Sequence, residues 1–150
     1  MPLLRLPVFV LMLALVAAAM LVPATVAALE GDWRTGRGFL YGALFAGVSA
    51  GVLGLALGGV RAGAAAVSRE ILALLGRWTL LPVFAAVPLV LLTPQIGVHG
   101  AIFEMVAAFT TTGGTVYGAP GRLPDAIHLW RGLAGGSGGC LTLMAAWVGR

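Results

Sequence analysis

The sequence has no lysine, no asparagine and one cysteine, and only 9% of its 150 residues are charged. Soluble domains carry roughly 25% charged residues, so this chain has too little polar surface to cover itself in water. Its 60% hydrophobic content points to a lipid bilayer as its surroundings. The single Cys140 has no partner for a disulfide and no second metal ligand, so we expect a small core residue there.

The positive charge comes from arginine alone, and it is scattered along the chain. The formal charge of +4 forms no basic stripe of the kind that binds nucleic acid, which argues against that class of partner. The arginines fall between apolar runs, where they suit membrane interfaces. The sequence has no paired carboxylates, no His/Cys cluster and no nucleotide-binding loop, so we expect neither an enzyme nor a cofactor.

Four apolar stretches are long enough to cross the hydrocarbon as helices, which takes about 20 residues. They cover residues 6–29, 38–60, 71–93 and 126–148. A fifth apolar stretch, residues 97–109, is too short to cross. The first stretch can also be interpreted as a secretory signal, because small residues follow the apolar run. Its length and Pro23 favour a retained helix.

The charges flanking these stretches predict that both termini lie in the cytoplasm. An even number of spans puts the two termini on one side, and the positive-inside rule selects that side. Arg77 lies about two turns inside the third stretch, where it either snorkels to the interface or has a buried partner. The rule weighs Arg5, Arg61, Arg69 and Arg150 inside against Arg34, Arg37 and Arg122 outside.

Glycine is abundant, with 23 copies, and two patterns of it carry a structural prediction. In the second stretch, Gly47-x-x-x-Gly51 and Gly54-x-x-x-Gly58 predict faces where another helix approaches closely. In the fourth stretch, the glycine-rich run 132–139 predicts a loosened helix or a hinge, because each glycine costs a helix roughly 1 kcal/mol relative to alanine.

The segment from His99 to Tyr117 carries the strongest functional signal. A short apolar helix ends in three threonines and two glycines, Thr110–Gly114, and a turn-rich exit leads to the next span. Irregular backbone at membrane depth is tolerated only inside protein or along a water-filled cavity. A re-entrant helix points its negative end at the pore, and an extended Thr/Gly strand can offer carbonyl oxygens to a dehydrated cation. The alternative is a plain helix C-cap and loop at the membrane surface.

The run Phe103-Glu104-x-x-x-Ala108 through Phe109-Thr110-Thr111-Thr112-Gly113 resembles the first pore loop of the TrkH family of potassium uptake subunits. Residues 123–131, which include Trp130-Arg131, resemble that family's approach to its next helix. Pro23, Trp78, Pro82 and Pro88 also match members of the family.

The resemblance implies an all-α membrane protein with four transmembrane helices, one re-entrant pore helix and a filter loop. Members have two leading helices and four helix–pore loop–helix units. This chain would supply the leading pair, residues 1–70, and the first unit, residues 71–150, so it is truncated relative to the family. Residues 99–109 would be the pore helix, ended by Thr110. Carbonyl groups would come from Thr111, Thr112, Gly113 and Gly114, with K⁺ bound at Thr111, Thr112 and Gly113.

Two charged residues stand beside this predicted filter. Glu104 either adds negative potential at the pore mouth or anchors the loop through a basic residue behind the filter, and the anchor is favoured. Arg131 is the candidate partner for that anchor. In this interpretation neither residue touches the ion; each supports the residues that do.

The predicted function is potassium transport through a pore in the inner (plasma) membrane. The expected partners are the lipid bilayer, the remaining pore units and, by resemblance, a cytoplasmic nucleotide-binding regulatory subunit; no cofactor is expected beyond K⁺ as the transported ion. One carbonyl strand cannot enclose an ion, so the pore needs further units. The alternatives are a non-transporting membrane remnant or assembly partner, and a homotetrameric cation channel.

Overall fold

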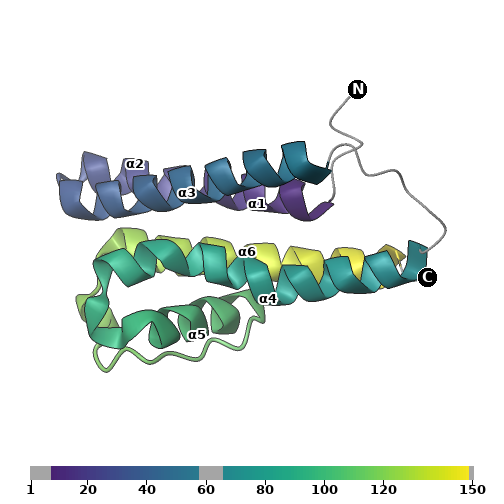
Figure 1. Ribbon diagram of the computed structural model, residues 1–150. Coiled ribbons are helices and arrows are strands. Elements are labelled where there is room, and N and C mark those ends of the chain that lie inside the picture. The colour runs from purple at the N-terminus through teal and green to yellow at the C-terminus, as the bar shows by residue number, and fades with distance from the viewer. Residues whose placement is uncertain (1–7, 58–65, 149–150) are drawn as a thin grey trace.

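The chain folds into helices joined by turns throughout the part that the structure describes. The computed structural model describes the backbone of residues 8–57 and 66–148, and the side chains of residues 9–57 and 79–139. The all-helical prediction is confirmed within these ranges. The elements, labelled in Figure 1, are α1 (Val8–Ala19), α2 (Leu21–Leu29), α3 (Trp33–Leu57), α4 (Ala66–Leu92), η2 (Pro94–Ile96), α5 (Gly97–Phe109), η3 (Pro120–Arg122) and α6 (Asp125–Val148).

Helices α1 and α2 form one apolar segment, Phe9–Leu29, with an irregularity at Met20. Pro23 explains it, because proline has no N–H and the carbonyl of Ala19 loses its helical partner. The chain stays helical through the irregularity, since Met20 N donates to Val16 O at 3.1 Å. With 21 residues the segment is long enough to cross the hydrocarbon, as predicted for the first span.

Helix α3 packs closely against α4 through two glycines near its start. A Cβ at Gly38 would lie 2.6 Å from a leucine of α4, and one at Gly42 would lie 2.7 Å from the ring of Pro88. A Cβ at Gly51 would meet nothing within 4 Å, and one at Gly47 only an alanine methyl at 3.9 Å. Among the described residues, therefore, no helix makes a close approach at Gly47-x-x-x-Gly51. The same spacing occurs earlier, at Gly38-x-x-x-Gly42, on the face that α4 covers.

Two described segments are long and apolar enough to cross a membrane, Phe9–Leu29 and Trp33–Leu57. A third candidate is bent, because the chain changes direction by 115° between Thr79–Leu92 and Pro94–Phe109, as in a broken span or a re-entrant loop. Four spans were expected, and two or three candidates are found among the described residues. Eight residues used in the sequence argument lie outside the described side chains: Arg5, Gly58, Arg61, Arg69, Arg77, Trp78, Cys140 and Arg150.

The chain reverses between α4 and α5 and reverses again after α5. At the first reversal Pro94 begins η2, and Gly97 takes a φ of 63° that favours glycine. Figure 1 shows α5 returning alongside α4, and the next segment running back along α5 to the start of α6. At 1.5 Å per residue α5 is about 20 Å long, against about 30 Å for a bilayer core. Its C-terminal end therefore lies partway along the length of α4 and α6.

Trp130 on α6 ties this helix–loop–helix unit to the leading helices. Its indole N–H donates to the carbonyl of Ala85 on α4 at 3.0 Å. Its ring meets Phe39 of α3 edge-on, with the ring centroids 6.1 Å apart. Both rings are fully buried, and aromatic pairs of this kind add about 0.5–1.5 kcal/mol beyond the area that they bury. The contact fixes α6, and with it the neighbouring Arg131, relative to α3 and α4.

Candidate ion-binding loop

Helix α5 ends in a Schellman cap built from three threonines. The N–H of Thr111 donates to the Ala108 carbonyl at 2.9 Å and that of Thr112 to the Ala107 carbonyl at 3.0 Å, the two bonds that define this motif. Thr111 has a φ of 58°, the left-handed conformation that the motif usually gives to glycine. Thr110 is the C-cap residue, so the short helix ends where the sequence indicated.

The cap alters the predicted shape of the loop. The sequence suggested an extended strand over Thr111–Gly114, but Thr111 and Thr112 belong to the capping turn. The prediction of an extended backbone is wrong at Thr111 and at Gly113, whose φ angles of 58° and 69° are left-handed, and the helix C-cap left open as an alternative describes Thr111. The physical reason is that the last carbonyls of a helix need donors, and the next amides in the chain supply them. Beyond the cap the chain continues without helix or strand to Ala119.

The loop turns most of its amide donors inward and leaves its carbonyl acceptors free. The N–H groups of residues 111–113 donate to carbonyls of α5, with Gly113 N at 3.3 Å from Ala107 O. Those of Val116 and Tyr117 donate to side-chain oxygens at 2.6 and 3.2 Å. Within the described residues, the carbonyl oxygens of residues 111–115 accept no hydrogen bond, and the amides of residues 114 and 115 donate none. The unbonded carbonyl oxygens of this loop can therefore offer lone pairs to a cation.

The three threonine hydroxyls also donate within the loop and the end of α5. Thr110 Oγ1 donates to the Val106 carbonyl at 2.7 Å, and Thr112 Oγ1 to the Ala107 carbonyl at 3.2 Å. Thr111 Oγ1 donates to the carbonyl of Thr110 at 2.7 Å. Because each hydroxyl proton is used in this way, the oxygen lone pairs remain as acceptors.

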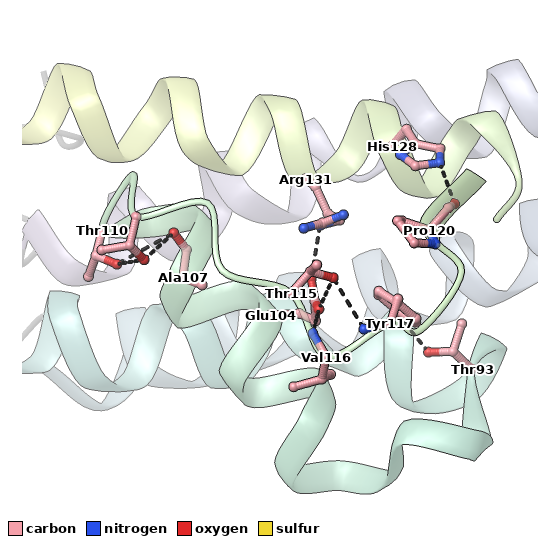
Figure 2. A network of polar contacts seen from close by, with 11 residues as sticks. Thr93, Glu104, Ala107, Thr110, Thr115, Val116, Tyr117, Pro120, His128 and Arg131 are labelled. Atoms are coloured by element: carbon pink, nitrogen blue, oxygen red, sulfur yellow. Dashed lines mark hydrogen bonds and ion pairs between the residues drawn. The ribbon is translucent and has the colours of Figure 1, made fainter. Parts of the chain in front are cut away.

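Glu104 joins α5, the loop and α6 through its two carboxylate oxygens (Figure 2). Oε1 accepts the hydroxyl of Thr115 at 2.7 Å and the amide of Val116 at 2.6 Å. Oε2 lies 2.9 Å from Nε of Arg131 as an ion pair. Glu104 is fully buried and the Arg131 side chain is 19% exposed. The structure thus brings together the two charged residues that the sequence suggested as partners, and a buried carboxylate with these contacts holds the loop against α5.

The exit of the loop is fastened to the end of α4. The hydroxyl of Tyr117 lies 3.0 Å from Oγ1 of Thr93, and both side chains are buried. The guanidinium of Arg131 lies over the Tyr117 ring, 5.9 Å from its centroid. The bend after α4 and the return of the loop are therefore linked by side chains as well as by the backbone.

Sequence reasoning did not single out Thr93, Thr115 or Tyr117. The available signal was the antiparallel return of the chain along α5, which brings a residue just past the helix end beside one a similar distance before it. Phe109 ends the helix, and Thr115 lies beside Glu104 on this pattern. The residue to look for was therefore one with a hydroxyl group, about as far after Phe109 as Glu104 lies before it.

An open groove of about 410 Å³ separates the loop from α6. Thr111, Gly113 and Gly114 of the predicted filter line it, while Thr110 and Thr112 do not. The groove is wide because the facing residues on α6 are glycines. Its lining is completed by Ala107, Ala108, Arg131, Gly132, Gly135 and Gly136.

The glycine-rich run does not interrupt α6. The helix continues without a break from Asp125 to Val148, so the structure shows no hinge within residues 132–139. Gly135 lies beside the end of α5, where an added Cβ would be 3.5 Å from the Ala108 carbonyl oxygen. Packing against α5 offsets the low helix propensity of these residues, which the sequence alone could not reveal.

The described chain is all-helical, with two or three candidate membrane spans, a sharply bent helix pair and a loop of unbonded carbonyl groups after the short helix. The chain is 44% identical over 62 residues to the Trk system potassium uptake protein TrkI of Halomonas elongata. That match covers 41% of this chain and 13% of the length of TrkI. No protein-family profile and no solved structure matches the chain.

Proposed function

We propose that this chain lines part of a potassium pathway through a membrane, in a protein similar to the Trk uptake systems. The observation that carries the proposal is the polarity of the loop after α5: the amides of residues 111–113, 116 and 117 donate to other protein groups, and the carbonyls of residues 111–115 stay unbonded within the described part of the chain. Cation filters replace an ion's water shell with oxygens of this kind. The partial match to TrkI supports potassium as the ion.

In this proposal K⁺ is held by the carbonyl groups of Thr111, Thr112 and Gly113, with Thr110 and Gly114 at the ends of the filter segment. The C-terminal end of α5 adds the negative pole of its helix dipole behind them. Glu104 and Arg131 hold the loop and do not contact the ion. Transport is passive movement along the electrochemical gradient, with no bond chemistry.

The complete pathway requires partners. The loop lines one side of a path, and residues 113, 115, 116 and 118 are exposed along it. Irregular backbone at membrane depth must be covered by protein or border water, so further pore units complete the filter. A cytoplasmic nucleotide-binding regulatory subunit is a further partner that the resemblance to the TrkH family implies.

The orientation follows from where the charges lie. The α2–α3 turn, the α4–α5 bend and the start of α6 share one end of the molecule (Figure 1). Three acidic and three basic residues at that end have no net charge, and the Glu104–Arg131 pair has none either. The other residues of the chain therefore carry the whole formal charge of +4. The positive-inside rule counts basic residues, and this end holds three arginines against five in the rest of the chain when the paired Arg131 is left out. In this proposal the end with three arginines therefore faces outward and both termini are cytoplasmic. The residues that cancel are Glu30, Asp32, Asp125, Arg34, Arg37 and Arg122.

The test is rubidium influx into cells that lack potassium uptake and express this chain, with Gly113→Asp and Gly118→Asp as a matched pair. A Cβ meets nothing within 4 Å at either glycine. Gly113 has a φ of 69°, which strains most side chains, and aspartate is one of the residues that adopt it most readily. We expect influx that Gly113→Asp abolishes and Gly118→Asp leaves largely intact. Such influx from the chain alone means a self-assembled channel, of which the homotetramer is the simplest.

A different result separates the remaining alternatives. Influx that appears only when further pore units are supplied from a second chain means that this chain is one part of a larger pathway. No influx in either setting, with the protein present in the membrane, contradicts the proposal and favours the non-transporting remnant or assembly partner.

A further inference from the structure

The carbonyl groups of the loop are fixed from behind at two separate places. At one end, the amides of Thr112 and Gly113 are held by the carbonyl of Ala107. At the other end, Oε1 of Glu104 holds Thr115 and Val116. The carbonyl groups proposed to bind the ion belong to the first anchored segment or lie between the two segments. The spacing of these carbonyls therefore depends on both anchors.

Thr115 is the link between the second anchor and the chain. Its hydroxyl donates to Glu104 Oε1 at 2.7 Å and accepts the amide of Tyr117 at 3.2 Å. One oxygen thus fixes the loop on both sides of Val116. Thr115 is exposed, so removal of its hydroxyl changes these hydrogen bonds and leaves the buried packing in place.

We propose that Thr115 is a positioning residue for cation selectivity, acting through its hydroxyl bond to Glu104. The inference rests on the proposed function, because it concerns the carbonyls assigned there to K⁺. Selectivity depends on the number, spacing and field of the carbonyl oxygens around the ion. Losing the hydroxyl removes two of the three hydrogen bonds described for Glu104 Oε1 and Thr115 Oγ1, and leaves the bond from the Val116 amide to Glu104. The loosened carbonyls can then adapt to the smaller Na⁺.

The variants for the test are Thr115→Val, Thr115→Ser and Tyr117→Phe. Valine keeps the shape of threonine without the hydroxyl, and serine keeps the hydroxyl. Tyr117→Phe removes the bond to Thr93 but leaves the backbone amide and the Glu104 contacts, so it controls for general loosening of the exit. The first readout is the ratio of rubidium to sodium influx in cells that lack potassium uptake.

We expect Thr115→Val to conduct with a ratio lowered roughly fivefold to tenfold, the loss that corresponds to about one hydrogen bond. Thr115→Ser and Tyr117→Phe should keep the wild-type ratio within about twofold. A wild-type ratio in Thr115→Val overturns the inference and leaves the proposed function standing.

A second readout applies if the wild-type chain alone carries no influx. Hydrogen exchange of the Val116 and Tyr117 amides is measured on the full chain in nanodiscs, in K⁺ and in Na⁺. We expect slower exchange in K⁺ for the wild type and no such difference for Thr115→Val. A difference that persists in Thr115→Val overturns this inference alone. No difference in the wild type overturns the inference together with the ion-binding role.

Discussion

The backbone of Gly138 on α6 lies directly against the carbonyl group of Phe109, the last residue of α5. A Cβ at Gly138 would overlap that carbonyl oxygen and would come within 3 Å of two more backbone atoms of Phe109. Backbone atoms cannot swing aside as a flexible side chain can. The crossing point of the two helices, and hence the position of the cap and the loop, therefore requires glycine at residue 138.

Gly138→Ala is expected to destabilise the protein by about 1–3 kcal/mol, the usual range for overpacking a tight contact. Gly136→Ala is the control, because a Cβ there meets nothing within 4 Å. It should stabilise α6 by about 0.5–1 kcal/mol through its higher helix propensity. Thermal unfolding in detergent measures both. Equal midpoints for the two variants would contradict the close crossing.

Thr111→Gly is expected to stabilise the chain by about 0.5–1 kcal/mol, because a threonine at positive φ is strained and glycine is not. The control is Thr110→Gly, since Thr110 has a φ of −81° and its hydroxyl bonds to Val106. That variant should lower the unfolding midpoint. A decrease for both variants would mean that residue 111 does not take the left-handed conformation.

Glu104→Gln and Arg131→Met are each expected to destabilise the protein by about 3–5 kcal/mol, because each leaves a charge in the interior without its partner. The double variant should lose less than the sum by about 1–3 kcal/mol, the coupling expected for groups in contact. A double-mutant cycle of thermal unfolding gives this coupling. Simple additivity would show that the ion pair is absent from the folded protein.

Asp32 gives a pH dependence outside the membrane-spanning segments. The carboxylate accepts the hydroxyl of Thr35 at 2.5 Å and its amide at 3.1 Å, as a cap for α3. These bonds, that of the hydroxyl foremost, hold the pKa of Asp32 below its ordinary value. A lowered pKa stabilises the fold above the unfolded pKa, near 3.9, and this contribution disappears as the pH falls through the folded pKa.

The expected result is a gap in unfolding midpoint between the wild type and Asp32→Ala that is constant above about pH 5 and narrows below about pH 4. Asp32→Asn is the control, because asparagine caps a helix well but does not titrate. The difference in unfolding midpoint between Asp32→Asn and Asp32→Ala should not narrow between about pH 5 and about pH 4. If the gap widened as the pH fell, the pKa of Asp32 would be raised in the folded protein, and the carboxylate could not be capping α3.

Much of the architecture could be predicted from the sequence because it depends on local signals. The length of each apolar run sets the helices, and Pro94 together with Gly97 marks the reversal before the short helix. Glu104 and Arg131 were identifiable as partners because few other charges lie near the predicted filter. Each of these features depends on residue type and spacing within one segment.

The parts that could not be predicted depend on contacts between segments. Gly38 and Gly42 lie against α4, whereas among the described residues a Cβ at Gly47 or Gly51 would meet no atom closer than 3.9 Å, although the glycine spacing is the same in both pairs. The glycines of α6 stay helical because α5 packs on them. The left-handed Thr111 is equally hidden, since threonine rarely adopts that conformation and only the two cap bonds enforce it.

The ion pair between Glu104 and Arg131 also sets an order of events during synthesis. The ribosome makes α5 before α6, so Glu104 enters the insertion machinery before its partner exists. A carboxylate without a partner is costly in hydrocarbon. In the proposed pore, the short helix α5 is therefore expected to reach its final depth only after Arg131 has been made.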